Sequence, residues 1–258
     1  MRRRFGVLAT LAMTVGVLLT AAQAAAAQPS YVALGDSYAA GDGTGVYYNT
    51  SCYQSPDSYP PLVAAADGYA LNFQACSGAT TSTVESSQLS ALGTGTKLVT
   101  VQVGGNDAGF TNVMVSCAVE YFTCTSAISS ANAEIENDLP GLLSTLYGDI
   151  HKDAPNARVL VIGYPRLFDA AGDTCGINLL TSSHEKDLNN TANLLDSAIQ
   201  DEAADHGFTF VDPRSAFSSH ELCSSSPWLN NDTIPVQESY HPNIAGEAGY
   251  ASLIEGIL

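Results

Sequence analysis

The sequence predicts an α/β protein, a three-layer α/β/α sandwich around a mostly parallel, five-stranded, doubly wound sheet. Two observations lead to this fold class. Short, nearly continuous apolar runs are typical of parallel strands that are buried on both faces. These runs alternate with stretches in which apolar residues recur every three or four positions, as on one face of a helix. The chain of 258 residues shows no repeat and no linker, so residues 28–258 are expected to form a single domain.

Five apolar runs, rich in valine, leucine, isoleucine and aromatic residues, are the predicted strands. In chain order they are Tyr31–Leu34, Tyr69–Phe73, Leu98–Val103, Val159–Gly163 and Thr209–Val211. The predicted helices are Leu139–Ile150, Leu188–Ala203 and Ile244–Ile257. Pro140 starts or kinks the first helix, Gly207 ends the second, and Asn243 is suited to cap the third.

The first 27 residues have the pattern of a secretory signal peptide and are not expected to be part of the fold. Arg2, Arg3 and Arg4 precede an apolar stretch at 5–20, and small residues follow through Ala27. A membrane anchor is the alternative. However, this apolar stretch is short for a membrane span, and no other run of the chain approaches that length. We therefore expect a secreted, extracellular protein with no stable membrane anchor.

Acidic residues dominate the charge of the chain. Nine Lys and Arg stand against 26 Asp and Glu, a formal net charge of −17. Removal of the first 27 residues takes away three arginines and no acid, which changes the net charge to −20. Such a surface argues against nucleic acid and anionic membranes as electrostatic partners. It does not exclude lipid substrates, because an active site can accept an acyl chain through apolar contacts.

Six cysteines in an exported chain indicate three disulfides, which could be paired in fifteen ways. No C-x-x-C motif occurs, and the five histidines show no metal-ligand spacing, so no metal site is expected. Three polar stretches that contain cysteines are predicted to be loops held by disulfides. They are Asp42–Pro61, Ser116–Thr125 and Leu222–Val236.

Three turn-like motifs contain side chains that are suited to chemistry. Gly35-Asp36-Ser37 follows the first predicted strand, Gly104-Gly105-Asn106-Asp107 follows the third, and His241-Pro242-Asn243 lies near the end of the chain. A hydroxyl, an amide and an imidazole are the parts of an acyl-transfer site: nucleophile, oxyanion donor and base. Each motif alone would more readily be an ordinary turn or cap, and Asp36 and Asp107 are expected only to hold turns. Together, after strands of an α/β sheet, the motifs predict an active site.

These motifs, with a further glycine at position 78, resemble the four sequence blocks of the SGNH/GDSL hydrolases. The cysteine pattern and the export signal are similar to those of the secreted actinobacterial lipases, phospholipases and esterases of that family. The resemblance extends from residue 31 to about residue 243, which is nearly the whole chain after the leader. It implies the flavodoxin-like variant of the predicted fold.

The resemblance also implies a role for each site residue. Ser37 is similar to the nucleophile of the family, and His241 to its base. The N–H groups of Ser37 and Gly78 and the side-chain amide of Asn106 are similar to its oxyanion hole. Together with short loop closure, the resemblance implies the disulfides Cys52–Cys76, Cys117–Cys124 and Cys175–Cys223.

The group that orients His241 is left open by the sequence. Many members of the family carry Asp three residues before this histidine, and here that position is Glu238. The Glu238 carboxylate could accept the Nδ1–H of the imidazole and complete a catalytic triad. Alternatively, a backbone carbonyl of Glu238 or Ser239 accepts this proton, leaving a Ser37–His241 dyad and Glu238 in solvent.

The expected function is that of a serine hydrolase of carboxylic esters, a lipase, phospholipase or esterase that forms an acyl-enzyme. No cofactor is expected, the protein is expected to be a monomer, and the expected substrate is an acyl lipid. Two alternatives remain open: a carbohydrate esterase that removes acetyl groups, and a non-catalytic secreted binding protein on the same fold. The joint presence of the four site residues weighs against the binding protein.

Overall fold

The computed structural model describes residues 27–169 and 180–258, and its centre is a sheet of five parallel strands. The strands are β1 (Ser30–Gly35), β2 (Ala70–Phe73), β3 (Leu98–Gln102), β4 (Arg158–Ile162) and β5 (Thr209–Val211). Each lies within a residue of its prediction, so the five predicted strands are confirmed. All four neighbouring pairs are parallel, and the sheet is therefore parallel throughout.

The order of the strands fixes where a ligand can bind. The order is β2-β1-β3-β4-β5, so the chain leaves β1 toward one edge of the sheet and then returns to the other side of β1. This reversal opens a crevice at the carboxyl ends of β1 and β3. Gly35 at the end of β1 pairs with Gln102 at the end of β3, which brings the two predicted motifs that follow these strands to the same crevice.

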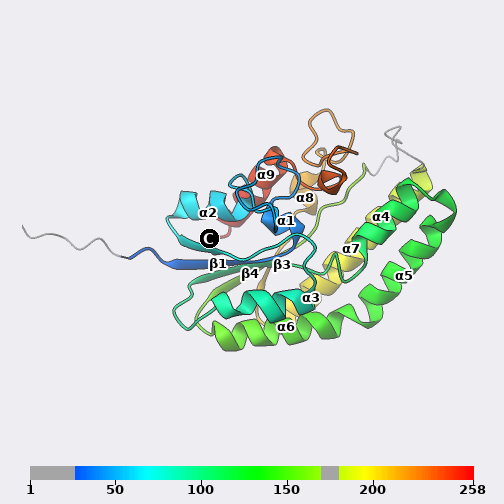
Figure 1. Cartoon of the computed structure of the whole chain (residues 1–258). Helices are drawn as coiled ribbons and strands as arrows, with labels where there is room; N and C mark the ends of the chain where they lie inside the picture. The colour runs from blue at the N-terminus through cyan, green and yellow to red at the C-terminus, as the bar shows by residue number, and fades with distance from the viewer. Residues whose placement is uncertain (1–26, 170–179) are drawn as a thin grey trace, which may run out of the picture.

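Helices cover both faces of the sheet, which confirms the three-layer architecture (Figure 1). On one face lie α2 (Tyr59–Asp67), α9 (Ile244–Glu255) and the short α1 (Ser37–Ala40) and α8 (Arg214–Phe217). On the other lie α3 (Thr81–Thr83), α6 (Leu139–Asp153) and α7 (Ser182–Asp205). The other short helical elements are a π-helix, η1 (Val84–Gln88), and three 3₁₀ helices, η2 (Leu89–Ala91), η3 (Tyr121–Thr123) and η4 (Val236–Glu238).

The three predicted helices are present, with the expected boundary signals. Pro140 lies in the first turn of α6 and therefore starts this helix without kinking it. Asn243 caps α9, because its side chain accepts hydrogen bonds from the N–H groups of Ala245 and Gly246. Gly207 has a positive φ of 71° just beyond the end of α7, a conformation that glycine adopts readily.

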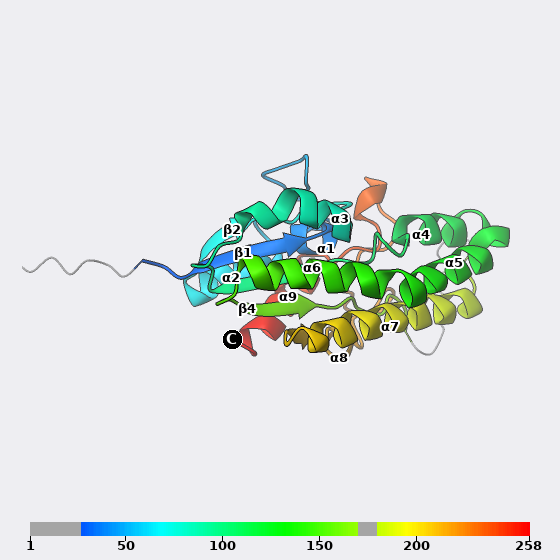
Figure 2. The same ribbon diagram turned by 90° about the horizontal axis from the view of Figure 1, so that it is seen from below.

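The prediction of a loop over Ser116–Thr125 is wrong, because this segment holds the end of one helix and the start of another. These helices are α4 (Phe110–Ala118) and α5 (Cys124–Asn137), which project beyond the ends of the strands (Figure 2). Their buried side chains include several alanines and cysteines, whose small apolar surface gives a weak sequence pattern. The predicted loop over Asp42–Pro61 also ends early, since the two prolines lie in the first turn of α2.

Two disulfides join the pairs that the family resemblance implied. Cys52–Cys76 joins the long loop after α1 to the segment after β2, with 4.3 Å between the Cα atoms. Cys117–Cys124 joins the end of α4 to the first residue of α5, with 4.2 Å between the Cα atoms. The third expected pair includes Cys175, which lies outside the described residues, as do residues 1–26 of the expected signal peptide. Within the described ranges, no helix is both long enough and apolar enough to cross a membrane.

A buried carboxylate ties α9 to α2. Ser58, the N-cap residue of α2, makes no capping bond with its side chain. Instead Glu247 of α9, which is fully buried, accepts a hydrogen bond of 2.8 Å from the Tyr59 N–H. Burial raises the pKa of Glu247 well above its ordinary value of 4.5, although the bond from Tyr59 opposes the shift. The protonated form is therefore the one that the folded state prefers.

Glu247 should make the fold less stable as pH rises. Its pKa is raised in the folded state, so its contribution is complete below about pH 4.5, its unfolded value, and declines above it. Glu247→Gln keeps an acceptor for Tyr59 and carries no charge, so its free energy of unfolding should exceed that of the parent increasingly from pH 5 to pH 8. The slope of this difference is at most about 1.4 kcal/mol per pH unit. Denaturant unfolding at several pH values measures it, with the exposed Glu255→Gln as control; parallel curves for parent and Glu247→Gln would contradict the assignment.

Candidate active site

Ser37 is held at the turn between β1 and α1. Gly35 adopts a φ of 141°, and a Cβ at this position would lie only 2.4 Å from the Gln102 carbonyl oxygen. The close approach of β1 to β3 therefore requires glycine. Asp36 caps α1, since its Oδ1 accepts a hydrogen bond of 3.0 Å from the Tyr38 N–H. Ser37 is the first residue of the helix, at the crevice between β1 and β3.

Asp36 also anchors this turn to the other half of the sheet. Its Oδ2 accepts a hydrogen bond of 2.6 Å from the hydroxyl of Tyr164, which follows β4. Burial raises the pKa of Asp36 to about 7, while the bonds from Tyr164 and Tyr38 act in the opposite direction. The expected role of Asp36 in holding a turn agrees with these contacts. Asp107 differs from its expected local role, because its carboxylate binds the N–H and hydroxyl of Thr81, 26 residues away.

His241 lies against Ser37 from the opposite end of the sequence. Its Nε2 is 2.8 Å from the Ser37 Oγ, and its Nδ1 is 3.0 Å from the carbonyl oxygen of Ser239. With the proton on Nδ1, the ring donates to Ser239 and Nε2 can accept the proton of the serine hydroxyl. Burial lowers the pKa of His241 from 6.5 to about 4, so the ring is neutral at neutral pH.

The backbone just before His241 is held in an unusual conformation. Tyr240 has a positive φ of 66°, which is rare for a residue with a large side chain. Its carbonyl accepts a hydrogen bond of 2.7 Å from the Tyr38 hydroxyl, and the Tyr38 ring packs 5.1 Å from the imidazole. The turn that carries His241 is thus fixed by the helix that carries Ser37.

The Glu238 carboxylate is engaged elsewhere. Its Oε1 accepts a hydrogen bond of 2.7 Å from the hydroxyl of Tyr47. The Nδ1 of His241 faces the Ser239 carbonyl instead, as the second of the two alternatives expected. The further expectation of that alternative, Glu238 in solvent, is wrong, because Glu238 is half-buried and bonded to Tyr47. The reason is local geometry: Glu238 ends the turn η4, and the chain after it bends so that a backbone oxygen lies beside the ring.

The remaining predicted groups lie around the Ser37 hydroxyl. Gly78 and Asn106 line the same cleft as Ser37 and His241. Gly78 has a φ of 80° and open space where a side chain would be, so its backbone is accessible. Asn106 donates one amide hydrogen to the Ala79 carbonyl at 2.9 Å, which leaves the second hydrogen for another acceptor. These donors can stabilise negative charge that develops on an oxygen beside Ser37.

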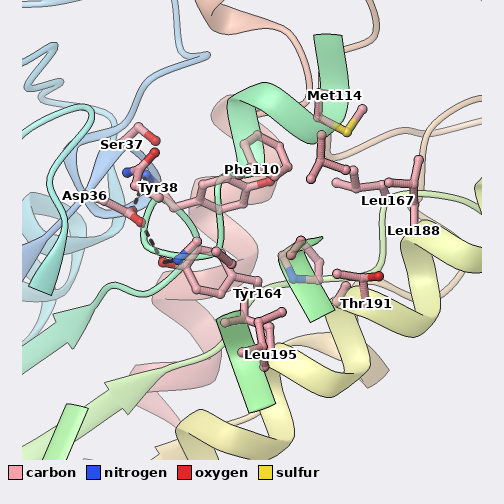
Figure 3. Close-up of a pocket in the computed structure, with 18 residues that line it drawn as sticks. Asp36, Ser37, Tyr38, Phe110, Met114, Tyr164, Leu167, Leu188, Thr191 and Leu195 are labelled. Atoms are coloured by element: carbon pink, nitrogen blue, oxygen red, sulfur yellow. Dashed lines mark hydrogen bonds between the residues drawn. The ribbon is translucent and has the colours of Figure 1, made fainter. Parts of the chain in front are cut away.

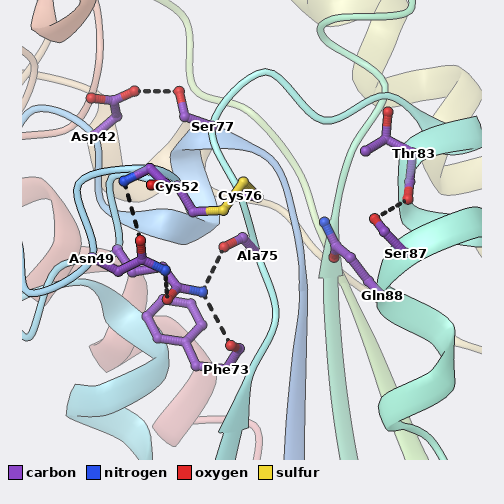
Figure 4. Close-up of a disulfide and its surroundings, with 12 residues drawn as sticks. Asp42, Asn49, Cys52, Phe73, Ala75, Cys76, Ser77, Thr83, Ser87 and Gln88 are labelled. Carbon is purple, nitrogen blue, oxygen red and sulfur yellow. Dashed lines mark hydrogen bonds between the residues drawn. A yellow bond between two sulfur atoms is a disulfide. The ribbon is translucent and has the colours of Figure 1, made fainter.

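Asp42 is a site residue that the sequence analysis missed. Its N–H donates to the Ser37 carbonyl at 3.0 Å, and its Oδ2 accepts a hydrogen bond of 2.6 Å from the Ser77 hydroxyl (Figure 4). Asp42 therefore links the turn of Ser37 to the residue that precedes Gly78, close to the disulfide Cys52–Cys76. Burial raises the pKa of Asp42 to about 6. Its position between two glycines is the only signal in the sequence, and that signal indicates a turn as readily as a site.

An apolar cavity, called here the inner cavity, opens beside Ser37 (Figure 3). It extends from Ser37 and Tyr38 between α4, α5 and α7, away from the sheet. Its apolar lining is Ala108, Phe110, Val113, Met114, Ala131, Ile135, Pro165, Leu167, Leu188, Ala192 and Leu195. Such a lining suits a hydrocarbon chain, because apolar contacts hold a hydrocarbon without a polar partner. This cavity was not predicted from the sequence, because α4 and α5 were not predicted.

A second and wider depression, called here the outer cleft, lies on the other side of Ser37. Its volume is about 460 Å³, within the range of small-molecule sites. Its floor includes Ser37, Gly78 and His241, and its walls come from α4 and from residues 232–240. Ser37, Asn106, Phe110 and Met114 line both the outer cleft and the inner cavity, so the two spaces meet at the serine.

Comparison with known proteins places this chain in a family. The GDSL-like lipase/acylhydrolase family matches residues 33–248. Lipase 1 of Streptomyces coelicolor is 44% identical over 268 residues, which cover 98% of this chain and 99% of that protein.

Two crystal structures are similar over nearly the whole described chain. The structure of the extracellular lipase from Streptomyces rimosus has a TM-score of 0.86 and 41% identity, and the match covers 90% of this chain and 100% of that one. Phospholipase A1 from Streptomyces albidoflavus has a TM-score of 0.83 and 40% identity, with 89% and 99% covered. The match in sequence and the match in structure agree: this chain belongs to the GDSL-like lipase/acylhydrolase family.

Proposed function

We propose that this protein is a secreted serine hydrolase that cleaves carboxylic esters of acyl lipids through an acyl-enzyme. The observation that carries the proposal is the 2.8 Å contact between the Ser37 Oγ and the His241 Nε2, at the point where the inner cavity opens. A nucleophile paired with a base, beside an apolar cavity, is suited to an ester whose acyl part is a hydrocarbon chain. The lipase and phospholipase names of the relatives support the same substrate class.

In the first half of the reaction, Ser37 attacks the ester carbonyl and forms the new carbon–oxygen bond. His241 takes the hydroxyl proton on Nε2, and the carbonyl oxygen becomes an oxyanion. The N–H groups of Ser37 and Gly78 and the amide of Asn106 stabilise this charge. The bond to the alcohol then breaks, and His241 gives the proton to the departing alkoxide.

In the second half, water replaces the alcohol. His241 takes a proton from the water as it attacks the acyl-enzyme, and the proton then passes to the Ser37 oxygen as the acid leaves. Burial favours the neutral ring, which is the form that can accept a proton. The Ser239 carbonyl holds the Nδ1 proton and supports the positive charge when the ring is protonated.

The inner cavity favours a lipid over a carbohydrate acetyl ester. This cavity has a volume of about 70 Å³, and its lining from α4, α5 and α7 is mostly apolar, which suits the acyl part of a lipid ester. Hydrolysis of chromogenic esters across chain lengths separates the two: a preference for long acyl chains supports the lipid, and activity on acetyl esters alone supports the carbohydrate esterase. Absence of any hydrolysis supports a binding protein.

The remaining parts of the proposal concern the whole chain. We infer that residues 1–27 direct export and are removed, that 28–258 form the mature domain, and that Cys223 pairs with Cys175. Export is supported by the proposed acyl-lipid substrate and by the similarity to a lipase from Streptomyces rimosus that is described as extracellular. A single chain supplies every proposed catalytic group, which supports a monomer that acts without a cofactor.

Ser37→Ala should abolish ester hydrolysis, a loss of roughly 10⁴-fold or more, and leave the thermal unfolding midpoint nearly unchanged. The substitution removes only a hydroxyl from the nucleophile. A fluorophosphonate probe should label the parent at Ser37, and peptide mass analysis locates the label. Ser87→Ala, at an exposed serine, is the control. Labelling that persists in the Ser37→Ala protein would refute the assignment.

Asn106→Ala should lower kcat by roughly 10²–10³ and change KM little, because the amide acts on charge that exists only in the transition state. Steady-state kinetics with a soluble ester measure both constants. Asn137→Ala, at an exposed position of α5, is the matched control. A change confined to KM would mean that Asn106 holds substrate or a loop and not the oxyanion.

Glu238→Gln and Glu238→Ala should each lower kcat/KM only a few-fold, because the Ser239 carbonyl holds the imidazole. Tyr47→Phe removes the hydroxyl that binds Glu238 and should have an equally small effect. A loss near 10⁴ for Glu238→Gln would instead establish the carboxylate as the acid of a triad.

A further inference from the structure

Exposed aliphatic side chains gather at the mouth of the outer cleft. Val115 of α4 is 48% exposed, Val119 just after α4 is 66% exposed, and Val236 on the opposite wall is 77% exposed. Ile234, two residues from Val236, is 97% exposed. Nine large apolar side chains of the described residues are exposed, and four of them belong to this group. We call these four residues the rim.

The rim combines two segments that lie far apart in the sequence. Val115 and Val119 line the cleft from α4 and the residue after it, and Val236 lines it from η4. Ser37 and His241 line the same cleft. Exposed apolar side chains that surround the entrance of a binding cleft mark a surface for an apolar partner.

The charge around the rim limits the kind of partner. No Lys or Arg lines the described part of the outer cleft, whereas Asp42 and Asp232 do. Two of the six Lys and Arg of residues 28–258, Lys97 just before β3 and Arg158 at the start of β4, lie at the amino-terminal edge of the sheet, opposite the cleft. With the acidic balance of the whole chain, this arrangement disfavours anionic head groups.

We propose that the rim docks on the surface of neutral or zwitterionic lipid aggregates and that the cleft then receives a lipid directly from that surface. This inference rests on the proposed function, since a lipid ester is the substrate that such docking delivers. Aliphatic side chains from both walls enter the boundary between head groups and acyl chains, as in proteins that bind membranes peripherally. Ser37 then lies below the entering ester, and the inner cavity lies beyond it.

The test separates docking from catalysis by measuring binding with an inactive protein. Ser37→Ala protein is mixed with phosphatidylcholine vesicles and recovered by flotation, at low and at high salt. It should bind, with little dependence on salt, and bind less to vesicles that contain phosphatidylglycerol. Adding Val119→Ser and Ile234→Ser, one from each wall, should weaken binding about tenfold or more. Leu142→Ser, at a 39% exposed leucine of α6, is the matched control and should bind like the parent.

A second measurement uses Ile234→Ser alone in the active protein, because Ile234 does not line the outer cleft. Hydrolysis of a short, fully soluble ester should stay within about twofold of the parent, and hydrolysis of vesicle lipid should fall in parallel with binding. Equal vesicle binding with and without the rim substitutions would overturn the proposal, and so would a salt-sensitive preference for anionic vesicles. If the parent fails to hydrolyse the soluble ester, the proposed function itself fails, whatever the vesicles show.

Discussion

The junction at Gly35 is the constraint on which the site depends. Its missing side chain lets the end of β1 approach β3, and Asp36 N–H donates to the Gln102 carbonyl across that gap. The Gly35 carbonyl accepts bonds from the Gln88 side chain and from the Cys76 N–H, which begins the segment of Gly78. One small residue thus sets the distance between the serine turn, the asparagine turn and the glycine turn.

The histidine is oriented by the backbone and by burial, without a second charged group. A carboxylate beside a buried imidazole would have to lose its own hydration, and such burial is costly unless every partner is in place. The Ser239 carbonyl avoids this cost, because a neutral acceptor is enough to fix the tautomer. The hydroxyl of Tyr38 holds the adjoining carbonyl, so the orientation of His241 depends on the same helix that presents Ser37.

The sheet and the polar residues of the site could be predicted from the sequence because their signals are local. Apolar runs indicate strands. The serine, asparagine and histidine turns each resemble an ordinary turn or cap, and it is their combination that indicates a site. The Ser239 carbonyl that orients His241 could not be predicted. Every residue has a backbone carbonyl, so the residue type does not indicate which one accepts the imidazole proton. The inner cavity was missed for another reason: it arises from packing between helices rich in small side chains, such as Ala127 and Ala131 of α5.

The hairpin of α4 and α5 lies outside the sheet and is closed by a disulfide across seven residues. It supplies one wall of the inner cavity. The polar groups around Ser37 come from turns that lie outside the hairpin. Apart from Phe110, whose ring packs 6.2 Å from that of His241, substitutions in this hairpin are expected to change which acyl chains fit without disturbing the proposed proton transfer. In evolutionary terms, substrate selectivity and reactivity are separable in this fold. An enzyme of this kind can change its substrate range through substitutions in the α4–α5 hairpin alone.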